Sequence, residues 1–193
     1  MRRARFDVER KKIYSAIWKW VPATYYDWPL EQRAKCLGAK STQLLCKALL
    51  MDNKQSDGMD PLTNPKFVLV VLQYDSTLDV RKLANSIRSL KAVKDRKEFS
   101  KFDFRVADAA DNDRLTGYPF NSVTPFGLME SVPIVLSEAV AQIKFLWMGG
   151  GHIHLKLGMS VSQFCKATGA IIADISQPKG ILAGAEYDGT DCK

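Results

Sequence analysis

The residue most suggestive of chemistry is Lys47, which interrupts an otherwise apolar run from Leu44 to Met51. A lone ammonium group in such a run must reach water, pair with another group or face a cleft, because burying an unpaired charge is costly. If it faces a cleft, Lys47 is a candidate site residue. Alternatively, the run is an edge strand whose lysine points to water and discourages pairing with other strands. The pattern alone leaves both interpretations open.

A second candidate is the segment Thr116–Gly127, which has glycine and proline near both ends. These residues indicate a rigid, irregular loop whose backbone N–H groups are free to face a ligand. Such a loop could hold the carbonyl oxygen of an ester as that oxygen gains charge. An ordinary structural turn is the alternative interpretation.

Three glycines and a histidine, Gly149 to His152, form a third candidate between two expected strands. Glycines permit close approach of a phosphate or a ribose, whereas a tight hairpin is the equally simple alternative. A P-loop is excluded because no Lys-Ser/Thr pair follows. His152 and His154 would share a strand face, but without a third histidine a solvated face is favoured over a metal site. We therefore expect no metal and no cofactor.

Nucleophilic catalysis by the protein has little support in the sequence. Ser122, Thr124 and Ser160 have no obvious His–Asp partners, so a serine triad is not indicated. The four cysteines show no CxxC spacing, and two of them lie inside apolar patterns typical of core residues.

Alternating helices and strands must position these residues. Apolar spacing predicts helices over residues 7–20, 27–38, 79–91, 108–116 and 160–169, with a small one after Ser137. It predicts strands over residues 44–51, 67–72, 102–106, 132–136, 145–148, 153–157 and 170–175. We expect a single domain over residues 1–176, with a helical extension at 1–29, a core at 30–176 and a loosely held tail at 177–193. The variable connections favour an α+β fold with a mixed, curled sheet.

Composition restricts the functional class. The 193 residues, 46% of them hydrophobic, suffice for one domain with a proper core. No apolar run is long enough to span a membrane, and the basic start is followed by charged residues instead of a signal core. A cytoplasmic location is therefore expected. The net charge of +7 suits an anionic partner, with nucleic acid the leading candidate.

Taken together, the segments resemble the YbaK/prolyl-tRNA-synthetase-associated family of aminoacyl-tRNA editing domains over about residues 30–176. Gln43–Leu50 is similar to the family strand that carries a functional lysine, and the similarity places Lys47 on that position. Leu115–Tyr118 and Val123–Gly127 match the family's LTGY and VsPfG motifs. Weaker similarities lie at Leu30–Gly38, Gly150–Gly151, Thr168–Ala170 and Ala173–Ile175.

The resemblance implies a barrel-like mixed sheet of about seven strands flanked by helices. It also implies hydrolysis of the ester that joins a wrong amino acid to the terminal adenosine of tRNA, for example tRNA(Pro) charged with alanine or cysteine. The substrate's own ribose hydroxyl or cysteine side chain would assist, while the protein positions the ester and stabilises the oxyanion. Lys47 would hold the terminal nucleotide or orient the ester. The expected substrate-binding residues are Asn121, Ser122, Val123, Thr124, Pro125, Gly150, Gly151 and His152.

Two positions depart from the family pattern. Asn121 replaces a usual glycine, although asparagine tolerates left-handed backbone angles better than most residues. Ala48 replaces the threonine that usually follows the lysine. These departures keep open a non-catalytic module that binds tRNA or an aminoacyl-tRNA synthetase. Under either hypothesis the acceptor end of tRNA is the expected partner, with a synthetase as a further one.

Overall fold

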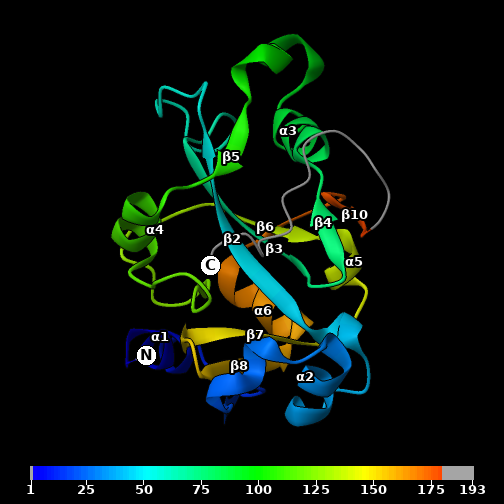
Figure 1. Cartoon of the computed structure of the whole chain (residues 1–193). Coiled ribbons are helices and arrows are strands. Elements are labelled where there is room, and N and C mark those ends of the chain that lie inside the picture. The colour runs from blue at the N-terminus through cyan, green and yellow to red at the C-terminus, as the bar shows by residue number, and fades with distance from the viewer. Residues whose placement is uncertain (1, 180–193) are drawn as a thin grey trace.

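The computed structural model describes residues 2–179 and is drawn in Figure 1. In this range the α-helices are α1 (Arg2–Arg10), α2 (Leu30–Leu37), α3 (Val80–Arg88), α4 (Ala109–Thr116), α5 (Glu138–Ala141) and α6 (Val161–Thr168). The strands are β1 (Ile17–Trp20), β2 (Cys46–Asn53), β3 (Phe67–Gln73), β4 (Ser76–Leu78), β5 (Phe104–Val106), β6 (Ile134–Ser137), β7 (Phe145–His152), β8 (Leu155–Ser160), β9 (Ile171–Ala173) and β10 (Ser176–Pro178). Short 3₁₀ helices cover Ala23–Asp27, Thr42–Leu44, Val93–Asp95 and Phe99–Lys101.

The largest sheet has five strands in the order β5-β2-β3-β6-β9. β2 is antiparallel to β3 and β5, whereas β6 is parallel to β3 and β9, so the sheet is mixed as predicted. Successive side chains of a strand point to opposite faces. On β3, Leu69 and Val71 join one core cluster, and Val68, Val70 and Leu72 join another. Both faces are therefore buried, which explains why β3 is apolar from Phe67 to Leu72.

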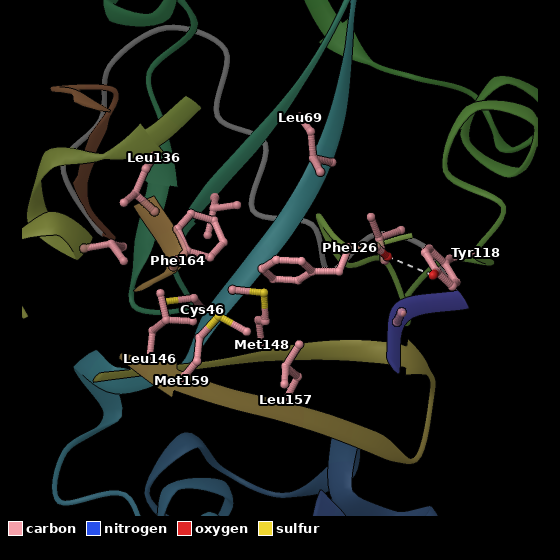
Figure 2. Packing of buried hydrophobic residues seen from close by; sticks show 14 of the residues in the cluster. Cys46, Leu69, Tyr118, Phe126, Leu136, Leu146, Met148, Leu157, Met159 and Phe164 are labelled. Atoms are coloured by element: carbon pink, nitrogen blue, oxygen red, sulfur yellow. Dashed lines mark hydrogen bonds between the residues drawn. The ribbon is translucent and has the colours of Figure 1, made fainter. Parts of the chain in front are cut away.

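One face of this sheet packs against α6 and against the hairpin of β7 and β8, as Figure 2 shows. Phe126 and Phe164 meet edge to face there, with ring centroids 6.0 Å apart. The opposite face is covered by α3, which contributes Leu83, Ala84 and Ile87. Phe126 belongs to the segment after α4, so the core itself fixes one end of that segment.

The prediction of a barrel of about seven strands is wrong. The ten strands of residues 2–179 form sheets of five, three and two strands, and they do not close on one another. β7 and β8 form a separate sheet with β1, and an isolated parallel bridge between Leu45 and Trp147 joins β7 to the residue that precedes β2. β4 and β10 escaped prediction because each has three residues, two or more of them polar, and shows no apolar run or alternation.

The predicted helix over residues 7–20 is also wrong in part. α1 ends at Arg10, Lys12 adopts a left-handed φ of 53°, and Ile17–Trp20 pairs with β8. Apolar residues there fit alternation as well as helical spacing, and pairing with β8 decides in favour of a strand. Asp27 does not cap a helix, since α2 begins after Pro29.

The remaining element predictions hold within a few residues, with two exceptions. The predicted strand over 153–157 begins only at Leu155, so His152 ends β7 and His154 lies in the turn. The predicted loose tail is partly ordered, because Ser176–Pro178 pairs with β4. Its remainder from residue 180, including Cys192, lies outside the described residues. None of the helices in residues 2–179 is both long and apolar enough to cross a membrane.

Candidate functional site

A pocket opens between β2 and the segment that follows α4. Side chains from β2, the 3₁₀ turn at Ala23–Asp27, α4 and the residue after β3 contribute to its walls. The lining residues are Tyr26, Cys46, Lys47, Ala48, Leu49, Leu50, Tyr74, Val106, Asn112, Phe120, Asn121, Val123 and Gly149. Three sequence candidates therefore meet here, namely the lysine of β2, two residues of the loop and the first glycine of the triplet.

Lys47 lies in the first half of β2, opposite Leu72 of β3. Only 6% of its surface is exposed, so its side chain does not extend into bulk water as the edge-strand alternative required. β5 pairs with β2 only from Met51 onward, which leaves the start of β2 beside the pocket. A buried cation on a pocket wall is suited to an anionic or polarised ligand group.

The segment from Gly117 to Gly127, here called the pocket loop, is closed by its own contacts. Gly117 and Gly127 have left-handed φ values of 69° and 68°. The Tyr118 hydroxyl donates to the carbonyl oxygen of Phe126 at 2.8 Å, as the dashed line in Figure 2 marks. Asn112 of α4 donates its side-chain amide to the Tyr118 carbonyl at 2.7 Å. The loop is thus a fixed structure, with its backbone turned by glycines at both ends.

The five predicted loop residues divide by position. Asn121 and Val123 line the pocket, and Asn121 has the left-handed φ of 64° that a glycine would readily adopt. Ser122 and Thr124 are fully buried, and the Ser122 hydroxyl donates to the carbonyl of Pro119 at 2.7 Å. Pro125 lines a separate groove beside α1. Of the five predicted loop residues, Asn121 and Val123 therefore line the pocket, together with Phe120 of the same loop.

The glycine triplet allows the backbone of β7 to pack closely on the pocket loop. A Cβ atom on Gly149 would lie 2.5 Å from the carbonyl oxygen of Val123. The Gly151 amide donates to the carbonyl of Ser122 at 3.0 Å, and a Cβ atom on Gly150 would lie 3.0 Å from the Leu155 carbonyl oxygen. Gly150, Gly151 and His152 follow directly after the pocket wall without forming part of it.

His152 is exposed, and its ring contacts the ring of Trp20 with centroids 5.4 Å apart. The ring of His154 lies 5.5 Å from that of His152. Across residues 2–179, no three His, Cys, Asp or Glu side chains are placed to hold a metal ion.

Sequence reasoning missed a second buried lysine beside the pocket. Lys156 alternates with His152 and His154 in the sequence, a pattern that is typical of a wet strand face, but its exposed fraction is 4%. Its ammonium group donates to the hydroxyl of Tyr26 and lies 4.2 Å from the centre of that ring. Burial and the nearby Arg33 guanidinium lower the pKa of Lys156 to about 7. The signal was available, since Lys156 is a single charge in the apolar run Leu155–Met159, as Lys47 is in its own run.

Tyr26 connects Lys156 to the pocket loop. Its hydroxyl donates to the carbonyl oxygen of Asn121 at 2.7 Å. Arg33 lies over the rings of Tyr25, Tyr26 and Tyr74 at 5.4 to 5.8 Å and donates to the backbone carbonyl of Tyr26. Burial raises the pKa of Tyr26, so the phenol keeps its proton and can donate.

The lining offers positioning groups more than reactive ones. Burial raises the pKa of the Cys46 thiol, which keeps it from acting as a thiolate nucleophile. Among the lining residues that the structure describes, none is a histidine, aspartate or glutamate. The groups that can act on a ligand are therefore the amine of Lys47, the backbone dipoles and side chain of the loop at Asn121, and the phenol of Tyr26.

These observations define a class of α+β proteins in which a pocket carries a buried lysine on one wall and a loop with glycine at both ends on another. The family model described as aminoacyl-tRNA editing domain matches residues 29–167, and the chain belongs to this family. The resemblance seen in the sequence is thereby confirmed.

Solved structures agree on the fold. A protein described as a candidate trans-editing enzyme for prolyl-tRNA synthetase superposes with a TM-score of 0.71 at 19% identity, covering 91% of this chain and 96% of that one. A hypothetical protein superposes with a TM-score of 0.67 at 22% identity, covering 91% and 99%. A comparison with curated proteins gives no significant match.

Proposed function

We propose that this protein is an aminoacyl-tRNA deacylase that hydrolyses the ester bond of a mischarged tRNA. The observation that carries the proposal is the position of Lys47, a buried cation on the wall of a pocket whose other wall is the loop at Asn121 and Val123. Membership of the editing-domain family supports the same reaction.

In the proposed reaction, water adds to the carbonyl carbon of the ester, and the carbonyl oxygen gains charge. The bond to the ribose oxygen then breaks, and that oxygen takes up a proton, so that a free amino acid and an uncharged tRNA leave. Lys47 orients the ester or the terminal nucleotide, and its charge opposes the negative charge that develops. The lining, where the structure describes it, provides no carboxylate or imidazole as a base. We therefore assign proton transfer to the substrate's own ribose hydroxyl.

The substrate that we propose is tRNA(Pro) carrying alanine or cysteine. One similar structure is described as a candidate trans-editing enzyme for prolyl-tRNA synthetase, which supports this choice. The net charge of +7 favours binding of the tRNA acceptor end. We propose a cytoplasmic location, with an aminoacyl-tRNA synthetase as a further partner. Since Asn121 projects toward the pocket where the family has glycine, the preferred amino acid can differ from that of relatives.

The second candidate is a non-catalytic module that binds tRNA or a synthetase. The replacements at Asn121 and Ala48 motivate it. Against it, Asn121 adopts a left-handed φ of 64°, a conformation that a glycine would readily take at this position. Both candidates predict tRNA binding that weakens with salt, and only turnover separates them.

The deciding experiment presents the purified protein with a panel of mischarged tRNAs, Ala-tRNA(Pro) and Cys-tRNA(Pro) among them. We expect release of the amino acid from at least one of them. Lys47→Ala should lose this activity, whereas Lys94→Ala, a matched change at an exposed lysine away from the pocket, should keep it. No release above the Lys47→Ala level from any tRNA would refute the proposal.

A further inference from the structure

The segment before residue 29 lies outside the family match, yet it contacts the pocket loop at three points. α1 contacts both ends of the loop, and the 3₁₀ turn at Ala23–Asp27 contacts its middle. Figure 1 shows α1 below the loop that follows α4. These contacts join residues more than 90 positions apart in the sequence.

Arg3 connects the two ends of the loop through hydrogen bonds. Its guanidinium donates to the carbonyl oxygens of Gly117 at 2.6 Å and Gly127 at 3.2 Å, so one side chain ties together the start and the end of the loop. The same group lies 5.0 Å from the centre of the Tyr118 ring. The fit is close, because a Cβ atom on Gly127 would lie 2.6 Å from the backbone carbon of Arg3.

Asp7 adds a second tie at the end of the loop. Its carboxylate accepts the amide of Gly127 at 3.0 Å and is paired with Arg10 at 2.7 Å. Burial raises the pKa of Asp7, but the contacts with Arg10, the Gly127 amide and Lys11 outweigh burial and leave the pKa below its usual value. The carboxylate is therefore charged at neutral pH and accepts a strong hydrogen bond.

In the middle of the loop, Tyr26 contacts Asn121, whose left-handed backbone conformation is unfavourable for a residue other than glycine. Asn121 and Lys12 are the non-glycine residues of the described chain with a left-handed φ, and such a conformation persists only when its surroundings impose it. The Tyr26 hydroxyl donates to the Asn121 carbonyl at 2.7 Å and accepts from Lys156. Tyr26 also forms part of the pocket wall.

We propose that this N-terminal segment is a positioning element of the active site, in which Arg3 and Asp7 fix the ends of the pocket loop and Tyr26 fixes Asn121. The inference rests on the proposed deacylase function and adds the residues that hold the pocket in its working shape. A misplacement of about 1 Å at a reacting centre costs roughly 100-fold in rate. Partial release of the loop should therefore lower kcat more than it changes KM for tRNA.

The test compares Tyr26→Phe and Arg3→Met with the matched controls Tyr14→Phe and Arg2→Met. Tyr14 is 82% exposed, and Arg2 is exposed on the same helix as Arg3. We expect kcat for deacylation to fall about 10-fold or more in each test variant, with KM within about twofold. Both controls should retain the wild-type kcat. Melting temperatures identify any variant whose loss of activity reflects unfolding.

A second readout does not need activity. Hydrogen exchange of the Gly127 amide, which donates to Asp7, should accelerate about 10-fold or more in Arg3→Met and stay unchanged in Arg2→Met. Wild-type kcat in both test variants, with wild-type exchange of the Gly127 amide in Arg3→Met, would overturn the inference while the deacylase proposal stands. Accelerated exchange in an Arg3→Met variant of a protein that releases no amino acid from any tRNA would show that Arg3 fixes the loop and would refute the proposed function.

Discussion

Replacing Gly149 by alanine should displace the pocket loop. The added Cβ atom would lie 2.5 Å from the Val123 carbonyl oxygen and 3.3 Å from the backbone of Ser122. Because both are backbone atoms, no side chain can rotate away. Moving from 2.5 Å to the 3.0–3.4 Å of tight real contacts requires a shift of about 0.5 to 0.9 Å in the wall that carries Val123. Overpacking of this kind costs about 1–3 kcal/mol of stability.

A shift of this size in a wall of the pocket should cost roughly 100-fold in kcat. Gly169→Ala is the control, since nothing lies within 4 Å of its Cβ position while its φ of +63° strains any side chain. The control should lose about 1 kcal/mol and keep its kcat. The assays are urea unfolding and steady-state deacylation. Equal kcat for Gly149→Ala and wild type would refute the packing argument. If Gly149→Ala and Gly169→Ala lost kcat equally, the loss of kcat would be assigned to reduced stability alone.

Two further predictions concern stability. Lys156→Met should change the pH dependence of unfolding. Between pH 7 and 10.5 the unfolded lysine holds a proton that the folded lysine has released. The free energy of unfolding of the wild type therefore rises with pH relative to that of the variant, by on the order of a few kcal/mol over this range. Urea unfolding from pH 6.5 to 9.5 measures this, and a constant difference between the two proteins would contradict it. Asp79→Ala removes the cap of α3, which accepts the amides of Arg81 and Lys82, and should lower the free energy of unfolding by about 1 kcal/mol without changing kcat. An unchanged urea midpoint for that variant would show that the cap does not stabilise the fold.

Elements with local signals could be predicted from the sequence. Gly38, Gly117 and Gly169 end helices in the left-handed conformation, and Ser160 caps α6 by accepting the amide of Gln163. These signals lie within one turn of the element that they limit, so they need no knowledge of the rest of the chain. The arrangement of the strands had no such signal, because pairing of β1 with β8 joins residues about 140 positions apart.

The candidate site could likewise be predicted only in part from the sequence. Lys47 was found because a charge in an apolar run requires an explanation, and the family motifs indicated which loop faces it. Lys156 gave the same local signal, but its alternation with His152 and His154 also fits a wet strand face. What buries it is the ring of Tyr26, which comes from a segment 130 positions earlier. No local pattern contains that contact, so a role for Tyr26 could only come from the structure.

The central claim is that the pocket at Lys47 turns over an aminoacyl ester, and multiple-turnover hydrolysis measures this most directly. With mischarged tRNA in large excess over the protein, we expect many amino acids released per molecule of wild type. Lys47→Met should release none above the spontaneous rate while keeping its fold, since methionine fills the same apolar strand without a buried charge. Binding of tRNA without turnover on every mischarged substrate, or undiminished turnover in Lys47→Met, would contradict the claim.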